Sequence, residues 1–237
     1  MKILLIFPTI FEAGAFFKKS RHRAFLGACA HLDIGGVGFH AIVSGIGCGA
    51  SAERVKAFAF ETKPDIAILC GFCGACVENI KEGGILFETA NAEISRIFGE
   101  LNFTRAKIAS VGEVANSRKK EELGAAGFAG VEMESGFFGK FFEPEKFVHL
   151  RAVSDSMRSK IPAEFFDSMM DKSTGASSFS LSKFLKMWIK NPMLPARLVQ
   201  FAVSAGGAKK AYDAALMLAL EKIADFYLQN GGKNGNL

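Results

Sequence analysis

The chain has 237 residues, of which 49% are hydrophobic and 22% are charged, so it has enough apolar material for a large core and does not have the composition of a disordered segment. Its net charge of +5 is too small to indicate nucleic-acid binding. No apolar run reaches the roughly 18 residues of a membrane-spanning helix, and no signal-peptide pattern precedes the first strand. We therefore expect a cytoplasmic protein with reduced cysteines and no nucleic-acid partner.

Short apolar runs rich in Ile, Val and Leu recur along the chain, as is typical of strands that are covered on both faces. They lie at Lys2–Phe7, Phe39–Ser44, Asp65–Cys70, Gly84–Ala90, Arg105–Val111 and Phe147–Val153. Helices are expected between them, at Glu12–Ala30, Ala50–Thr62, Lys119–Gly124 and Met133–Phe142. This alternation predicts one α/β domain over residues 1–237, with a mixed, mostly parallel central sheet flanked by helices.

A basic segment follows the last predicted strand, because the chain from Lys172 to Tyr212 contains no Asp or Glu. Helical spacing is expected in this region at residues 181–189, Pro195–Ala205 and Lys209–Leu228, with breaks at Asn191-Pro192 and Gly206-Gly207. We therefore expect residues 156–210 to form a basic helical extension. It is either an ordinary packed hairpin with a solvated face, or a lid or patch that lies against a membrane surface.

Acidic residues follow or begin separate elements of the predicted fold. Glu12 comes after the first strand, Glu132 and Glu134 lie in the run Val-Glu-Met-Glu-Ser-Gly, and the pair Ser154-Asp155 follows the last core strand. Each of them alone is explained by helix capping or by the helix dipole. Ligands of open α/β sheets bind at the carboxyl ends of the strands, so together these acids predict one polar pocket there.

Two glycine-rich segments leave alternatives open. The segment Gly45–Ala50 fits the loose form of the dinucleotide fingerprint, and a glycine turn before a helix also offers N–H groups to an anion or a sugar hydroxyl. The cysteines at 70, 73 and 76 have the spacing of an iron–sulfur run, but position 80 is Ile where a fourth cysteine is expected. A strand end followed by a tight turn at Gly71–Gly74 is the alternative. The four histidines have no metal-ligand spacing, so we expect no metal and no cofactor.

Over residues 1–160 the chain resembles the nucleoside phosphorylase/nucleosidase family, which contains purine nucleoside phosphorylases and 5′-methylthioadenosine/S-adenosylhomocysteine nucleosidase. The resemblance rests on the acid after the first strand, the two glycine-rich segments, the Val-Glu-Met-Glu run and the Ser-Asp pair. The region beyond, with Lys-Asn-Pro-Met-Leu-Pro at residues 190–195, resembles the extension of the hopanoid-associated phosphorylase-like subgroup.

The resemblance implies a role for each matching residue. Asp155 would protonate the leaving purine, Glu134 would hold the ribose hydroxyls above Met133, and Glu12 would orient or deprotonate the attacking water. The other implied substrate contacts are Glu132, Val114, Ala115, Phe72, Gly71, Gly45 and Ser154. In a phosphorylase, Arg21 and Arg23 would bind phosphate, although the negative charge of Glu12 favours water as the nucleophile.

These roles predict a nucleosidase that hydrolyses the N-glycosidic bond of an adenine-type nucleoside with a variable 5′ substituent. The alternatives are a phosphate-dependent phosphorylase and a non-catalytic module that binds a nucleoside or a lipid. The expected partner is a small-molecule nucleoside, and a lipid-linked nucleoside or a membrane surface is the second class. Relatives of this kind imply a homo-oligomer.

Overall fold

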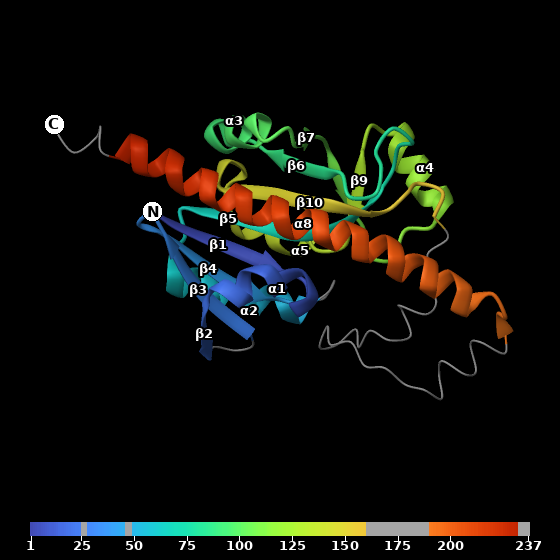
Figure 1. The fold of residues 1–237 in the computed structure, drawn as a ribbon, viewed down its shortest axis with the longest axis horizontal. Coiled ribbons are helices and arrows are strands. Elements are labelled where there is room, and N and C mark those ends of the chain that lie inside the picture. The colour runs from blue at the N-terminus through green and yellow to red at the C-terminus, as the bar shows by residue number, and fades with distance from the viewer. Residues whose placement is uncertain (25–27, 46–48, 160–189, 232–237) are drawn as a thin grey trace.

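The computed structural model describes residues 1–24, 28–45, 49–159 and 190–231 and has the predicted α/β fold (Figure 1). A mixed sheet of 10 strands has the order β2-β3-β4-β1-β5-β10-β6-β7, and β9 joins β8 to β5. The strands are β1 (Lys2–Phe7), β2 (Arg21–Ala24), β3 (Ala28–Ile34), β4 (Val37–Val43), β5 (Ile66–Ala75), β6 (Ile85–Thr89), β7 (Thr104–Arg105), β8 (Ile108–Ser110), β9 (Gly130–Glu132) and β10 (Phe147–Asp155). The centre of the sheet is parallel, because β4, β1, β5 and β10 pair in that sense.

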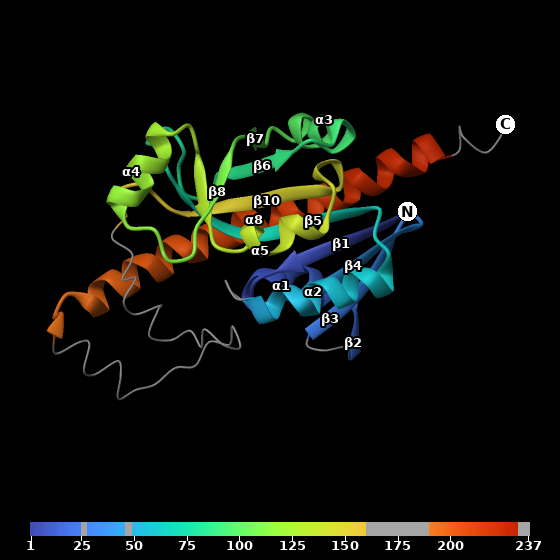
Figure 2. The same ribbon diagram turned by 180° about the vertical axis from the view of Figure 1, so that it is seen from behind.

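Helices cover both faces of this sheet, as the two opposite views show (Figures 1 and 2). They are α1 (Ile10–Lys19), α2 (Gly49–Thr62), α3 (Ala92–Glu100), α4 (Ser117–Ala125), α5 (Ser135–Phe138) and α8 (Leu194–Gly231), and two 3₁₀ turns, η1 (Gly139–Phe141) and η2 (Pro144–Lys146), follow α5. Helices α1, α3 and α8 pack on one face, and α2 and α5 pack on the other.

Strand β1 shows why the central strands are apolar throughout. Its residues Ile3 to Phe7 are all fully buried. Leu4 and Ile6 pack with α2, whereas Ile3, Leu5 and Phe7 pack with α1 and α8. A parallel strand that is buried on both faces has no solvent-facing position at which a polar side chain is favoured. The predictions of β1, α2, α4 and β10 are confirmed to within two residues at each end.

The prediction of one helix over Glu12–Ala30 is wrong. Helix α1 ends at Lys19, and Ser20 is extended, with φ −102° and ψ 164°. The chain then forms β2 and β3, and β3 pairs antiparallel with β4 from Cys29 to Ile34. This ladder is made with a strand further along the chain, so its hydrogen bonds override the local helical pattern.

The predicted turn at Gly71–Gly74 is also wrong, because β5 continues as a strand to Ala75. The strand keeps its parallel pairing with β10 through this segment, and Gly74 also pairs with Val131 of β9. Cys70, Cys73 and Cys76 are buried in three separate apolar clusters. Each thiol therefore packs as a small apolar side chain.

Helix α8 continues through Gly206-Gly207, where the sequence predicts a break. A Cβ atom on either glycine would meet nothing within 4 Å, whereas Ala208, Tyr212 and Leu216 are buried against the sheet. Burial of that face holds the helix together in spite of the low helix propensity of glycine. The helix predicted at 181–189 lies outside the described residues, and none of the described helices is long and apolar enough to span a membrane.

Candidate active site

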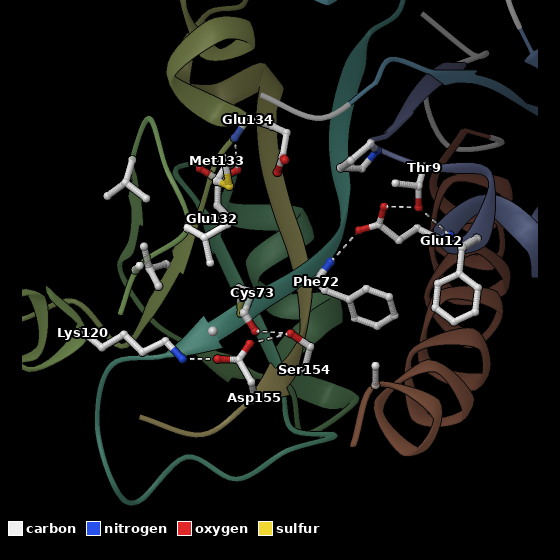
Figure 3. Close-up of a pocket in the computed structure, with 18 of the residues that line it drawn as sticks. Thr9, Glu12, Phe72, Cys73, Lys120, Glu132, Met133, Glu134, Ser154 and Asp155 are labelled. Carbon is white, nitrogen blue, oxygen red and sulfur yellow. Dashed lines mark hydrogen bonds and ion pairs between the residues drawn. The ribbon is translucent and has the colours of Figure 1, made fainter. Parts of the chain in front are cut away.

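A cavity of about 450 Å³ lies at the carboxyl ends of β1, β5 and β10 (Figure 3). This volume is within the range of small-molecule sites. The lining comes from six parts of the chain: Pro8–Glu12, Phe72–Gly74, Val111 to Lys120, Val131–Glu134, Ser154-Asp155 and Ala205 of α8. The three acids that carry the predicted chemistry, Glu12, Glu134 and Asp155, therefore lie in one cavity, although they come from three separate elements.

Glu12 lies in the first turn of α1, and its carboxylate is fixed on both sides. Thr9 caps the helix by accepting from the Glu12 N–H, and its hydroxyl donates to Glu12 Oε2 over 2.6 Å. The Phe72 N–H donates to Glu12 Oε1 over 3.0 Å. Burial raises the pKa of Glu12, although these hydrogen bonds and the charge of Arg151 oppose the shift.

The absence of a side chain at Gly71 leaves the space that the Glu12 carboxylate occupies. A Cβ atom at residue 71 would lie 2.3 Å from Glu12 Oε1, and the φ of Gly71 is +139°. Both the backbone conformation and the close approach of the carboxylate therefore require glycine here. Gly71 thus leaves room for the Glu12 carboxylate, and it is not among the residues that line the cavity.

Glu132 and Glu134 take different roles at the junction of β9 and α5. The Glu132 carboxylate accepts from the Glu134 N–H over 2.9 Å and from the Ser135 hydroxyl over 2.7 Å, so it caps the start of α5. The Glu134 side chain, in contrast, has no capping bond to α5. Figure 3 shows its carboxylate pointing toward the cavity.

Arg151 is a site residue that sequence reasoning missed. Its side chain on β10 is fully buried, and Nη2 lies 2.5 Å from Glu132 Oε2 and 3.1 Å from Glu134 Oε2. Nη1 lies 3.4 Å from the carbonyl oxygens of Cys70 and Phe72. The sequence signal was present, because a lone cation in the middle of the buried strand Phe147–Asp155 needs buried partners.

The Arg151 guanidinium thus lies close to two buried carboxyl groups, those of Glu132 and Glu134. Burial acts to raise the pKa of Glu132, but the charge of Arg151 and the hydrogen bonds from Ser135 and Glu134 hold that pKa below its usual value. Burial raises the pKa of Glu134 to about 8, with Arg151 opposing the shift and the nearby Glu132 and Glu12 adding to it. Glu132 is therefore the charged partner of Arg151, and Glu134 holds a proton near neutral pH.

Asp155 ends β10 at the opposite side of the cavity and is 2% exposed. The Ser154 hydroxyl donates to Asp155 Oδ1 over 2.8 Å. The ammonium of Lys120, from α4, forms an ion pair with Asp155 Oδ2 and donates to the Ser156 carbonyl over 3.0 Å. Sequence reasoning missed Lys120, because nothing in the charged run of α4 distinguishes it from its solvated neighbours.

The remaining predicted residues are placed as follows. Met133, Val114, Ala115 and Phe72 line the cavity, and the Phe72 ring lies 6.1 Å from Phe11 and 5.4 Å from Tyr212 between ring centroids. Gly45, Gly71 and Arg21 are not among the lining residues, and the Arg21 side chain is exposed on β2. The side chain of Arg23 lies outside the described part of the structure.

No protein-family model matches the sequence, and no curated protein sequence matches it. Solved structures do resemble it. An S-adenosylhomocysteine nucleosidase from Streptococcus pyogenes, in complex with 5-methylthiotubericidin, has a TM-score of 0.67 at 17% identity, over 93% of this chain and 96% of that one.

Two further structures extend this likeness. The 5′-methylthioadenosine/S-adenosylhomocysteine nucleosidase from Neisseria meningitidis, with methylthio-immucillin-A, has a TM-score of 0.67 at 14% identity, over 93% and 98% of the two chains. The enzyme of that name from Colwellia psychrerythraea, with adenine, has a TM-score of 0.59 at 16% identity, over 67% and 85%. The chain thus has the α/β fold of the 5′-methylthioadenosine/S-adenosylhomocysteine nucleosidases.

Proposed function

We propose that the protein is a nucleosidase that hydrolyses the N-glycosidic bond of an adenine-type nucleoside. The observation that carries this proposal is the convergence of Glu12, Glu134 and Asp155 on one cavity. Support comes from the structures with the same fold, which are nucleosidases by name and hold adenine or a methylthio-immucillin. The chemistry of the three acids suits cleavage of a sugar–base bond.

Cleavage of an N-glycosidic bond passes through a state in which the sugar carries positive charge and the base leaves with negative charge. In the proposed complex the purine lies near Asp155, and a proton delivered there neutralises the leaving base. Glu134 binds the ribose hydroxyls, and Met133 packs under the sugar. Glu12 accepts the proton of the attacking water, for which its raised pKa suits it.

The apolar lining supports a flat base and an apolar 5′ substituent. Phe72, Val114 and Ala115 line the same cavity as Asp155 and offer apolar faces to the purine ring. At the rim of the cavity, Ile10 and Phe11 are 57% and 53% exposed, so apolar surface there is available to a 5′ substituent. A 5′ alkylthio group fits this rim, and a lipid-linked nucleoside is the largest member of the same class.

Water, rather than phosphate, is the proposed nucleophile. A phosphate dianion needs free cationic donors. Among the described lining residues the cation is Lys120, which is paired with Asp155, and the Arg151 guanidinium behind them is paired with Glu132 and Glu134. Glu12 adds negative charge at the place where the nucleophile approaches. The Glu12 carboxylate would therefore repel phosphate.

The test is to incubate the purified protein with adenosine and with 5′-methylthioadenosine, and to measure free adenine by chromatography in buffers with and without phosphate. The proposal predicts equal adenine release in both buffers and a free sugar as the second product. Release that requires phosphate, with a sugar 1-phosphate as product, would show the phosphorylase instead. No release from either nucleoside would refute both activities on these substrates.

A further inference from the structure

The contact between Lys120 and Asp155 adds a second ionisable group to the part of the cavity where the purine is proposed to bind. The side chains of the two residues are 1% and 3% exposed, and both residues line the cavity. Lys120 is a lysine from a surface helix whose neighbours Arg118 and Lys119 have side chains that are 89% and 50% exposed. Burial of one basic residue out of three means that the fold directs it inward at a desolvation cost.

Two glycines allow this inward position. At Gly124 a Cβ atom would lie 2.2 Å from the Cys76 carbonyl oxygen, so glycine lets α4 dock closely on the end of β5. At Gly74 a Cβ atom would lie 2.9 Å from Lys120 Cε and 3.0 Å from Asp155 Oδ2. The Lys120 side chain therefore reaches Asp155 by passing over Gly74, which has no side chain. Asn116 fixes the start of the same helix by accepting from the Lys119 N–H over 2.9 Å.

The hydrogen bonds around Asp155 leave it as an acceptor. Oδ1 accepts from the Ser154 hydroxyl, and Oδ2 accepts from the Lys120 ammonium. In this arrangement Lys120 Nζ is the donor of the pair and the Asp155 carboxyl group is the acceptor. A carboxyl group that only accepts hydrogen bonds cannot protonate a leaving base by itself, so the proton that the reaction needs must reach Asp155 from a neighbouring donor.

We propose that Lys120 is the proton source behind Asp155: its ammonium proton passes through the Asp155 carboxyl group to the purine as the sugar–base bond breaks. This inference rests on the proposed nucleosidase function and deepens it. Lys120 acts through Asp155, so it is a positioning and proton-supplying residue. A purine that leaves as an anion would place another negative charge beside a buried carboxylate, and transfer of the ammonium proton removes that charge.

The atoms and charges of the step balance. The electron pair of the bond between the sugar and the purine goes to the purine, which takes one proton from Asp155. Asp155 takes one proton from Lys120 Nζ, which becomes a neutral amine. The oxygen of water forms the new bond to the sugar carbon, and Glu12 accepts the proton that this water releases. Exchange with solvent after product release returns that proton to Lys120.

A purely electrostatic role is the alternative, in which Lys120 keeps its proton and only holds Asp155 in place. Lys120→Arg separates the two possibilities, because arginine keeps the positive charge and does not release its proton. Lys120→Met removes both the charge and the transferable proton, and its side chain is of similar length. Lys119→Met is the matched control, since Lys119 is the adjacent residue and its side chain is half exposed.

The experiment measures kcat and KM for adenine release from 5′-methylthioadenosine, and the affinity for adenine by calorimetry. The second substrate is 4-nitrophenyl β-D-ribofuranoside, whose phenolate leaves without a proton. We expect Lys120→Arg and Lys120→Met to lower kcat on the nucleoside by about 100-fold or more. We expect adenine affinity and KM of Lys120→Arg to stay within about threefold, and Lys119→Met to match the wild type. Thermal denaturation verifies that each variant is folded.

The possible outcomes distinguish proton supply by Lys120 from a purely electrostatic role, and both of these from the absence of nucleosidase activity. Loss on the nucleoside with retention on the nitrophenyl riboside supports proton supply. If the wild type does not accept the riboside, loss of kcat with retained adenine affinity supports it in the same way. Lys120→Arg that keeps its kcat within about threefold, or equal loss on both substrates, overturns the inference while the nucleosidase stands. A wild-type protein that releases no adenine overturns the proposed function and this inference together.

Discussion

Arg151 and Glu132 form a fully buried ion pair, with the guanidinium Nη2 2.5 Å from the carboxylate Oε2. The charge of Arg151 holds the pKa of Glu132 below its usual value, whereas burial raises the pKa values of Glu134 and Glu12 although the same guanidinium opposes that shift. With its pKa raised to about 8, Glu134 holds a proton near neutral pH. Glu132 is therefore the charged partner of Arg151, and Glu134 lies protonated beside this ion pair.

Replacement of Arg151 tests this role of the pair. Arg151→Met leaves Glu132 charged and buried without its cation, so we expect the free energy of unfolding at pH 7 to fall by about 3–5 kcal/mol. Arg118→Met is the control, because the Arg118 side chain is 89% exposed and its ion pair with Glu122 contributes at most about 1 kcal/mol. Urea denaturation measures both. Equal losses for the two variants would contradict the account.

The proton on Glu134 gives stability a definite pH dependence. The pKa of Glu134 is raised from 4.5 to about 8, so between these values the folded protein binds more protons than the unfolded chain, and the contribution of Glu134 to stability declines as pH rises. Glu134→Gln has no such proton. We therefore expect the stability of Glu134→Gln relative to the wild type to increase from pH 5 to pH 8. Denaturation curves at several pH values measure the difference, and a constant difference would contradict the raised pKa.

Glu12→Gln tests the assigned role in water activation. The amide keeps the size of the side chain but cannot accept the proton of water, so we expect kcat on 5′-methylthioadenosine to fall by about 10²–10⁴-fold with little change in KM. Thermal stability should not fall, since burial already disfavours the charged form of Glu12. Glu53→Gln, whose parent side chain is 74% exposed, is the control. A Glu12→Gln variant with wild-type kcat would remove Glu12 from the mechanism.

Gly74→Ala tests the packing that brings Lys120 to Asp155. The new methyl group would lie 2.9 Å from Lys120 Cε, which forces the pair apart, and overpacking of this kind costs about 1–3 kcal/mol. We expect loss of stability together with reduced adenine release. Gly99→Ala in α3 is the matched control, because its Cβ would meet nothing within 4 Å. If both variants behave alike, the contact at Gly74 is not what constrains the site.

Gly207→Ala tests the continuity of α8. In a continuous helix with open space around it, alanine replaces glycine without strain, and we expect a gain of about 0.5–1 kcal/mol in the free energy of unfolding. Gly83→Ala is the contrasting variant: its φ of +82° makes the substitution destabilising. Chemical denaturation measures both. A destabilised Gly207→Ala would mean that the helix ends at the glycines, as the sequence pattern alone predicted.

The parts of the fold that could be predicted from the sequence are those with a strong local pattern. Strand β1 is an uninterrupted apolar run, and α2 has both helical spacing and a glycine start. The hairpin β2–β3, the short strand β9 and the continuation of β5 depend on pairing with distant strands. Such ladders leave little trace in the local sequence. This is why the prediction placed a helix over β2 and the start of β3, placed a turn at the end of β5 and included no strand at β9.

The candidate site follows the same division. Glu12, Glu134 and Asp155 could be proposed because each follows or begins an element near the carboxyl end of a strand, and the topology brings those ends together. Arg151 could have been found as the single cation in a buried strand. Lys120 could not, because its inward position depends on two close contacts in three dimensions, that of Gly74 with Lys120 itself and that of Gly124 with Cys76.

The most direct measurement of the central claim is the rate of adenine release from 5′-methylthioadenosine in phosphate-free buffer, for the wild type and for Asp155→Asn. The account predicts turnover by the wild type and a fall in kcat of about 10²-fold or more for the variant, because the amide cannot relay a proton to the purine. A wild-type protein without turnover, or an Asp155→Asn variant as fast as the wild type, would contradict it.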